Sequence, residues 1–221
     1  GEFFYRYIAE RRAKEPQPDV LSEFAHARFS DGTQPDIPEL IMLATFLFGA
    51  GQDTSAKLIG NAMRYLVDEP GLQEQLRADT KLIPAFLEET LRLEGSTKAV
   101  KRLAKRNMQV GGVEIPAGTI VIIAVAAANR DPRRWENPTA FQLNRPRIKE
   151  HIAFGRGAHT CAGAPLARDE VRIVFEKLLE HTKLIKLSEE KHGTPGNRRL
   201  NFEPTYSMRG LEDLYVEFEP A

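Results

Sequence analysis

The stretch without proline between Pro38 and Pro70 constrains the fold of this chain most strongly. Its apolar residues repeat with a helical period, so the sequence predicts one helix over residues 38–67. The part from Leu40 to Gly51 is apolar on almost all sides. A membrane span needs about 20 such residues, so this part favours a helix that runs through a protein core.

Shorter elements are expected on both sides of this helix. Helical spacing predicts further helices over residues 3–14, 20–29, 71–79, 83–93 and 162–182. The Gly-Gly pair between Val110 and Val113 is typical of a tight hairpin. We expect another strand over 119–123, irregular coil over 131–147, and a strand pair formed by 200–208 and 214–218. The predicted fold class is mainly α with small β-sheets.

Charge and cysteine content exclude some classes of function. The 31 basic and 31 acidic residues cancel, so no global field attracts the chain to nucleic acid or to a membrane surface. The single cysteine, Cys161, cannot form an internal disulfide, which fits a reducing compartment. It is therefore either a small buried apolar residue or a reactive thiol or ligand.

The neighbours of Cys161 favour the second role. Gly155 and Gly157 let the backbone turn tightly and approach a flat partner, and Gly163 leaves room for a bulky group. The predicted helix that starts at Ala162 has free N–H groups and a positive dipole end, which favour a thiolate. Such a thiolate in a glycine-lined loop is suited to an iron ligand.

Two other motifs have both a structural and a functional interpretation. Asp53 and Thr54 add polar side chains to the long helix just after Gly51. They are either a loosened, water-facing turn or part of a kink or groove beside a ligand, with an acid and a hydroxyl that relay protons. Glu89 and Arg92, three residues apart, lie on one helix face. Such a pair is usually a solvated ion pair that adds little stability.

The segment around Cys161 resembles the haem-binding loop of cytochrome P450s, Phe-x-x-Gly-x-His/Arg-x-Cys-x-Gly. Its fixed positions are occupied by Phe154, Gly157, His159, Cys161 and Gly163. The resemblance implies the P450 fold, with haem b as cofactor, Cys161 as the axial ligand to iron and His159 as a partner of a haem propionate. The histidine at this position, followed by a Leu-Ala-Arg sequence, is similar to the soluble bacterial branch, which implies a cytoplasmic protein.

The same resemblance assigns roles to the other motifs. The segment with Ala50 and Gly51 would cross the distal face of the haem, where Thr54 would steady bound dioxygen and Asp53 would help deliver protons. Arg102 is similar to the strand arginine that pairs with a propionate.

A structural role is implied for Glu89 and Arg92, which in the family are buried and joined by a second arginine, here Arg145. Together the three would hold the haem loop.

The resemblance covers the whole chain but only the second half of a P450. Residues 1–221 are therefore interpreted as the C-terminal haem-binding portion of one domain, an interpretation that the start at Gly1, without an initiator Met, also favours. A chain that lacks half its packing partners should expose apolar helix faces. By resemblance, residues 43–50, 95–100 and 204–208 line the substrate pocket. Their partly apolar character favours a lipophilic substrate, which could be a terpenoid, a steroid, a fatty acid or an aromatic compound.

The expected function is that of a haem-thiolate monooxygenase. It would insert one atom of dioxygen into a lipophilic small molecule with electrons from a ferredoxin or flavodoxin type partner, docked on a basic patch formed by Arg133, Arg134, Arg156 and Arg168. No nucleic-acid partner and no membrane span are expected. The alternatives are a peroxide-using haem-thiolate protein and a truncated or non-catalytic haem-binding protein.

Overall fold

The computed structural model describes residues 1–221, which form two compact units, residues 1–53 and 54–221. The boundary between the units falls inside the long helix α3 (Ile37–Asp68). The predicted helix over 38–67 is therefore confirmed. No helix of the structure is long and apolar enough to cross a bilayer.

The first unit contains α1 (Glu2–Arg12), α2 (Val20–His26) and the beginning of α3. Asp19 caps α2, because its side chain accepts a hydrogen bond from the Ser22 amide at 2.8 Å. A small core forms where four buried residues meet: Ile8, Ala25, Leu40 and Ala44.

Several apolar side chains of α3 lie outside this core. Met42 and Phe46 are 70% and 69% exposed, and Phe48 is 62% exposed. The prediction that residues 40–51 run through a core is wrong for these side chains. The expectation that apolar helix faces are exposed is confirmed.

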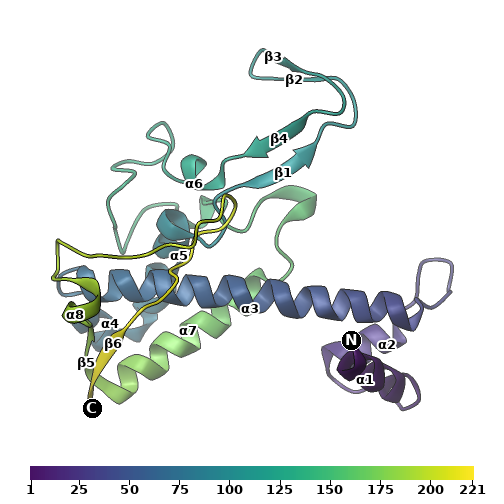
Figure 1. Cartoon of the computed structure of the whole chain (residues 1–221), viewed down its shortest axis with the longest axis horizontal. Helices are drawn as coiled ribbons and strands as arrows, with labels where there is room; N and C mark the ends of the chain where they lie inside the picture. Colours follow the sequence, from purple (N-terminus) through teal and green to yellow (C-terminus); the bar gives the residue numbers. More distant parts are fainter. The chain divides into compact units, whose positions relative to one another are not determined.

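The main core of the second unit lies among α4 (Leu72–Ala78), α5 (Ile83–Glu94), α7 (Ala164–His181) and the later part of α3 (Figure 1). Phe86 of α5 and Phe175 of α7 are fully buried and meet edge to face, with ring centroids 5.3 Å apart. These helices agree with the predicted ranges. Their packing positions the start and the end of the loop that carries Cys161, residues 154–163.

Two small antiparallel sheets follow α5. In the first, β1 (Val100–Leu103) pairs with β4 (Ile120–Ile123), so that Arg102 lies opposite Val121. The second is the hairpin of β2 (Met108–Val110) and β3 (Val113–Ile115), which lies at the far end of this ribbon (Figure 1). Gly111 and Gly112 turn it with positive φ angles of 56° and 83°, as the Gly-Gly pair predicts. A short helix, α6 (Val125–Ala128), continues from β4.

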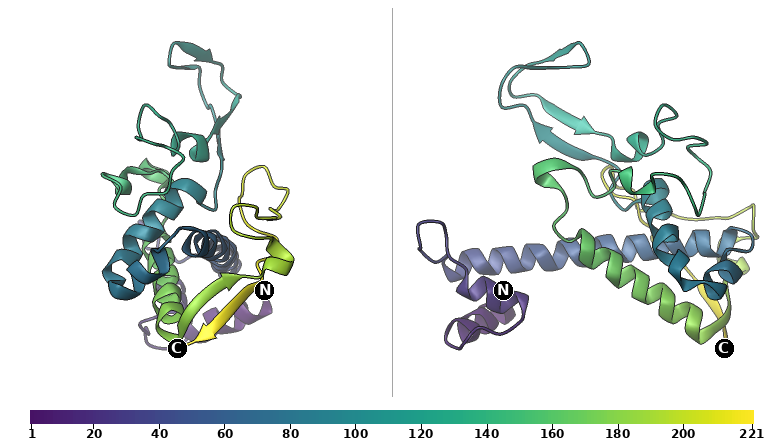
Figure 2. Two further views of the ribbon diagram at one scale, coloured as in Figure 1. Left: turned by 90° about the vertical axis from the view of Figure 1, so that its left-hand side faces the viewer. Right: turned by 180° about the vertical axis from the view of Figure 1, so that it is seen from behind.

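The C-terminal strands differ from the prediction. β6 (Val216–Pro220) pairs with β5 (Thr182–Leu187), directly after α7, and the two lie side by side in Figure 2. The predicted pairing of 214–218 with 200–208 is wrong. Ile185 and Leu187 of β5 are buried. Residues 200–208 form only isolated bridges.

The remaining elements are short. They are the helix α8 (Glu189–His192) and three 3₁₀ turns, η1 (Thr80–Leu82), η2 (Ile148–Glu150) and η3 (Gly157–His159).

Candidate functional site

The cysteine loop, residues 154–163, is closed by backbone hydrogen bonds. The Cys161 amide donates to the Phe154 carbonyl at 2.8 Å, and the Thr160 amide donates to the Gly157 carbonyl at 3.0 Å. Gly155 has φ +73°, and a Cβ there would lie 3.4 Å from the His159 carbonyl oxygen. Because this conformation is strained for other residues, the loop requires glycine at this position. The Cys161 side chain is held exposed, three residues before α7.

A cavity of about 230 Å³ lies against this loop within the second unit. It brings together several predicted site residues from α3, β1 and the cysteine loop, namely Thr54, Arg102, Phe154, Gly155, His159 and Cys161. Apolar side chains form much of the rest of its wall: Leu58, Leu91, Val100, Val125, Ala153 and Ala167. The cavity is therefore an apolar site with one thiol and two nitrogen-bearing side chains at its edge.

The remaining predicted residues occupy other positions. Ala50, Gly51 and Asp53 are exposed on α3 in the first unit. α3 is continuous α-helix through this segment. Gly157 and Gly163 lie in the cysteine loop, where a Cβ on Gly163 would be 3.9 Å from the Cys161 sulfur.

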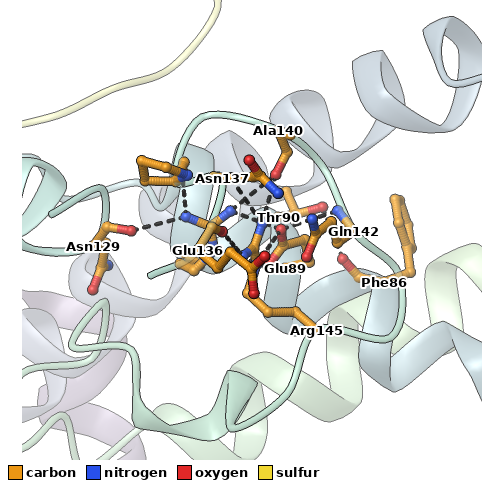
Figure 3. A network of polar contacts seen from close by, with 11 residues as sticks. Phe86, Glu89, Thr90, Asn129, Glu136, Asn137, Ala140, Gln142 and Arg145 are labelled. Carbon is orange, nitrogen blue, oxygen red and sulfur yellow. Dashed lines mark hydrogen bonds and ion pairs between the residues drawn. The ribbon is translucent and has the colours of Figure 1, made fainter. Parts of the chain in front are cut away.

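Glu89, Arg92 and Arg145 form the buried network that the resemblance predicts. Figure 3 shows Glu89 and Arg145 within it. The Glu89 carboxylate accepts two hydrogen bonds from Arg92, at 2.7 and 2.8 Å, and two from Arg145, at 2.9 and 3.0 Å. One negative and two positive charges would leave an excess cation. Backbone carbonyls balance it, since Arg92 also donates to those of Asn129 and Pro138 at 2.9 and 2.7 Å.

A second buried ion cluster was not predicted. Glu88, next to Glu89, accepts hydrogen bonds from His151 at 2.8 Å and from Arg168 at 2.5 Å. The His151 Nδ1 atom accepts the Ala153 amide at 3.2 Å, so Nε2 carries the hydrogen that points to Glu88. The Arg168 guanidinium lies over the Phe154 ring, 4.6 Å from its centroid. The cluster therefore joins α5 and α7 to the cysteine loop.

The cluster makes stability depend on pH. Burial raises the pKa of Glu88, but the hydrogen bonds from His151 and Arg168 outweigh it and lower the pKa from 4.5 to about 2. Because the folded pKa lies below the unfolded one, this stabilisation is present above pH 4.5 and is lost as the pH falls toward 2. We expect Glu88→Gln to reduce the free energy of unfolding by about 3 kcal/mol at pH 7 and by roughly half of that at pH 3.

Denaturant unfolding of the wild-type and variant chains at both pH values measures this difference. Glu180→Gln is the matched control, because Glu180 pairs with Lys177 on the exposed side of α7. It should leave the stability unchanged at both pH values. A deficit of Glu88→Gln that is equal at pH 7 and pH 3 would contradict the expectation.

The predicted basic patch is partly neutralised. Arg133 pairs with Asp131 at 2.6 Å, Arg134 pairs with Glu150, and Arg168 pairs with Glu88. The partners of Arg134 and Arg168 could not be predicted, because those carboxylates lie far from the arginines in the sequence. Only Asp131 lies close to its arginine. The net positive charge around Arg133, Arg134, Arg156 and Arg168 is therefore smaller than the number of these arginines suggests.

Comparisons with known proteins agree with this geometry. The family model "Cytochrome P450" matches residues 2–204. Cytochrome P450 144 of Mycobacterium tuberculosis is 40% identical over 180 residues, which are 81% of this chain and 41% of that protein.

Solved structures show the same likeness. Substrate-free cytochrome P450 CYP150A6 of Mycobacterium marinum has a TM-score of 0.94 and 47% identity, over all of this chain and 54% of that one. CYP109E1 of Bacillus megaterium in complex with corticosterone has a TM-score of 0.87 and 30% identity, over 97% of this chain and 55% of that one. The chain thus spans about half the length of the proteins it matches. By sequence and by structure, it belongs to the cytochrome P450 family.

Proposed function

We propose that the protein is a haem-thiolate monooxygenase that inserts one atom of dioxygen into a lipophilic small molecule. One observation carries this proposal: Cys161, His159, Arg102 and Thr54, which come from distant parts of the sequence, line a single cavity.

The residues of this cavity fit haem b. The porphyrin is flat and apolar and carries two carboxylates, and the cavity offers apolar walls with Arg102 and His159 for those carboxylates. Cys161 would be the ligand to the iron. It lies three residues before α7 and lines the cavity. Gly155 and Gly163 keep the adjacent backbone free of side chains.

When bound, the haem would supply an iron centre that binds and activates dioxygen, with the thiolate as the ligand that favours O–O cleavage. The protein's part is to position groups and to supply protons. The Thr54 hydroxyl lines the cavity, where it would position a proton, and the exposed Asp53 carboxylate, one residue earlier on α3, would help deliver protons.

Substrate and electron donor complete the proposal. The apolar walls favour a lipophilic substrate, and the complex of CYP109E1 with corticosterone shows that one relative binds a steroid. Electrons come from a ferredoxin or flavodoxin type partner that docks beside the cysteine loop, where Arg156 adds to the remaining positive charge. Reversing the charge of Arg156 should slow reduction by such a partner, and the effect should weaken at high salt.

The test is the reduced, CO-bound difference spectrum of the protein that carries this sequence at the full length of its relatives. A thiolate-type Soret band supports the proposal, and its absence overturns it. In the same protein, Thr54→Ala should divert reducing equivalents from product to peroxide. Peroxide alone should not support turnover, which separates this function from that of a peroxide-using relative.

A non-catalytic haem-binding protein is the second candidate. It would show the thiolate band without product under any electron donor, and Thr54→Ala would leave its spectrum and its consumption of reductant unchanged.

A further inference from the structure

The segment 95–98, just after α5, contacts two other parts of the second unit. The Ser96 hydroxyl donates a hydrogen bond to the backbone carbonyl of Thr54 on α3, at 2.7 Å. The Ser96 carbonyl accepts the Arg209 amide at 2.8 Å. Thr97 forms a bridge with Met208. Ser96 therefore connects the helix turn that carries Thr54 to the C-terminal loop, residues 204–209.

The bond from Ser96 acts on the helix itself. In an α-helix, the carbonyl of residue 54 accepts the amide of residue 58, and its second lone pair is free for another donor. Ser96 is only 8% exposed and lines the cavity, so water does not easily replace its hydroxyl at this carbonyl. A side chain that bonds into the helix ladder fixes the local tilt of the turn. This turn presents Thr54 to the cavity.

Ser96 is itself held firmly in place. A Cβ on Gly95 would lie 2.6 Å from the Leu91 carbonyl oxygen and 3.2 Å from the Ala153 side chain. Only glycine lets the chain pass this close, and the next residue thereby reaches α3. The side-chain amide nitrogen of Asn61 donates hydrogen bonds to the backbone carbonyls of Glu94 at 2.8 Å and Arg209 at 3.2 Å. The end of α5 and the C-terminal loop are therefore both hydrogen-bonded to α3.

The Glu94 carboxylate, 7% exposed, adds charge to the same connection. It pairs with Arg130 at 3.0 Å, with Arg64 of α3 at 3.4 Å, and with Arg209 of the C-terminal loop. Three guanidinium groups around one carboxylate restrict its motion more than one surface pair does. The position of Ser96 is thus set by groups that lie outside the cavity.

We propose that Ser96 is a positioning residue for Thr54: its hydroxyl fixes the orientation of the helix turn from which Thr54 acts. The inference rests on the proposed function, since Thr54 has a task only in that reaction.

Hydrogen–deuterium exchange of the full-length protein tests the physical part. Losing a hydrogen bond to the Thr54 carbonyl should speed amide exchange in the peptide that covers residues 54–58 by about two- to tenfold in Ser96→Ala. Ser96→Thr keeps the hydroxyl and should restore slow exchange. Ser207→Ala is the matched control, because Ser207 is exposed on the C-terminal loop. Unchanged exchange in Ser96→Ala, or equal acceleration in all three variants, would overturn the inference.

Coupling of reductant consumption to product tests the functional part. Ser96→Ala should divert reductant to peroxide in the same direction as Thr54→Ala, and the double variant should be no worse than Thr54→Ala. If Thr54→Ala uncouples the enzyme and Ser96→Ala does not, the inference fails and the proposed function stands. If Thr54→Ala itself leaves coupling intact, the proposed role of Thr54 fails.

Discussion

Arg92→Ala is expected to destabilise the fold strongly. The substitution removes both hydrogen bonds to buried Glu89 and the donors to the carbonyls of Asn129, which is buried, and Pro138, which is partly buried. Removing one partner of a buried ion pair costs about 3–5 kcal/mol, a large part of the 5–15 kcal/mol by which domains are typically stable. Thermal unfolding followed by circular dichroism should show the midpoint lowered by roughly 6–20 °C.

The control for this experiment is another paired arginine. Arg133 bonds to Asp131, but its side chain is 88% exposed, and exposed pairs contribute about 0–1 kcal/mol. Arg133→Ala should therefore unfold within a few degrees of the wild type. Arg92→Lys should be intermediate at best, because an ammonium cannot supply the planar fork of donors that Glu89 and the carbonyls receive. Equal midpoints for Arg92→Ala and Arg133→Ala would show that the network does not hold the fold.

Cys161→Ser is expected to abolish the thiolate-type band of the reduced CO complex and the turnover that depends on it. A serine hydroxyl stays protonated at neutral pH, so it cannot supply the thiolate that the proposed iron ligation requires. Changing groups that only support a metal ligand costs about 10–100-fold, and loss of the ligand itself should cost more than about 100-fold. The measurements are the CO difference spectrum and the product formed per haem, both in the full-length protein.

Ala162→Ser provides the control for the cysteine substitution. It adds a hydroxyl at the next, exposed position of the loop and leaves the sulfur in place, so the band should persist. Thermal unfolding of the two variants separates a lost ligand from a misfolded loop. A thiolate-type band that survives in Cys161→Ser would exclude this residue as the ligand.

Patterns that depend on neighbouring residues were predictable from the sequence. The period of α3, the Gly-Gly turn between β2 and β3, and the tight turns at Gly155 and Gly157 are local requirements of the backbone, and each is confirmed. Arg145 lies 56 residues after its partner Glu89 in the sequence. Only the family resemblance predicted that it joins Glu89 and Arg92. Local patterns alone would have described an exposed ion pair.

What could not be predicted depends on which distant segments meet. Glu88 looks like any helix carboxylate until His151 and Arg168 approach it from 63 and 80 residues away. The pairing of β6 with β5 brings together segments that are not adjacent in the sequence, and the pattern of each strand does not indicate its partner. Likewise, the polar character of residues 95–98 is visible in the sequence, but the target of the Ser96 hydroxyl is not.

The exposed thiol of Cys161 also offers a single site for chemical labelling of the chain. Because it is the only cysteine among the 221 residues, a maleimide dye or Ellman's reagent would modify this chain at one site and in one-to-one stoichiometry. A ligand that coordinates the sulfur should protect it from alkylation. Counting the modified fraction by intact-mass spectrometry would then give the occupancy of the site directly, without any optical signal from the cofactor.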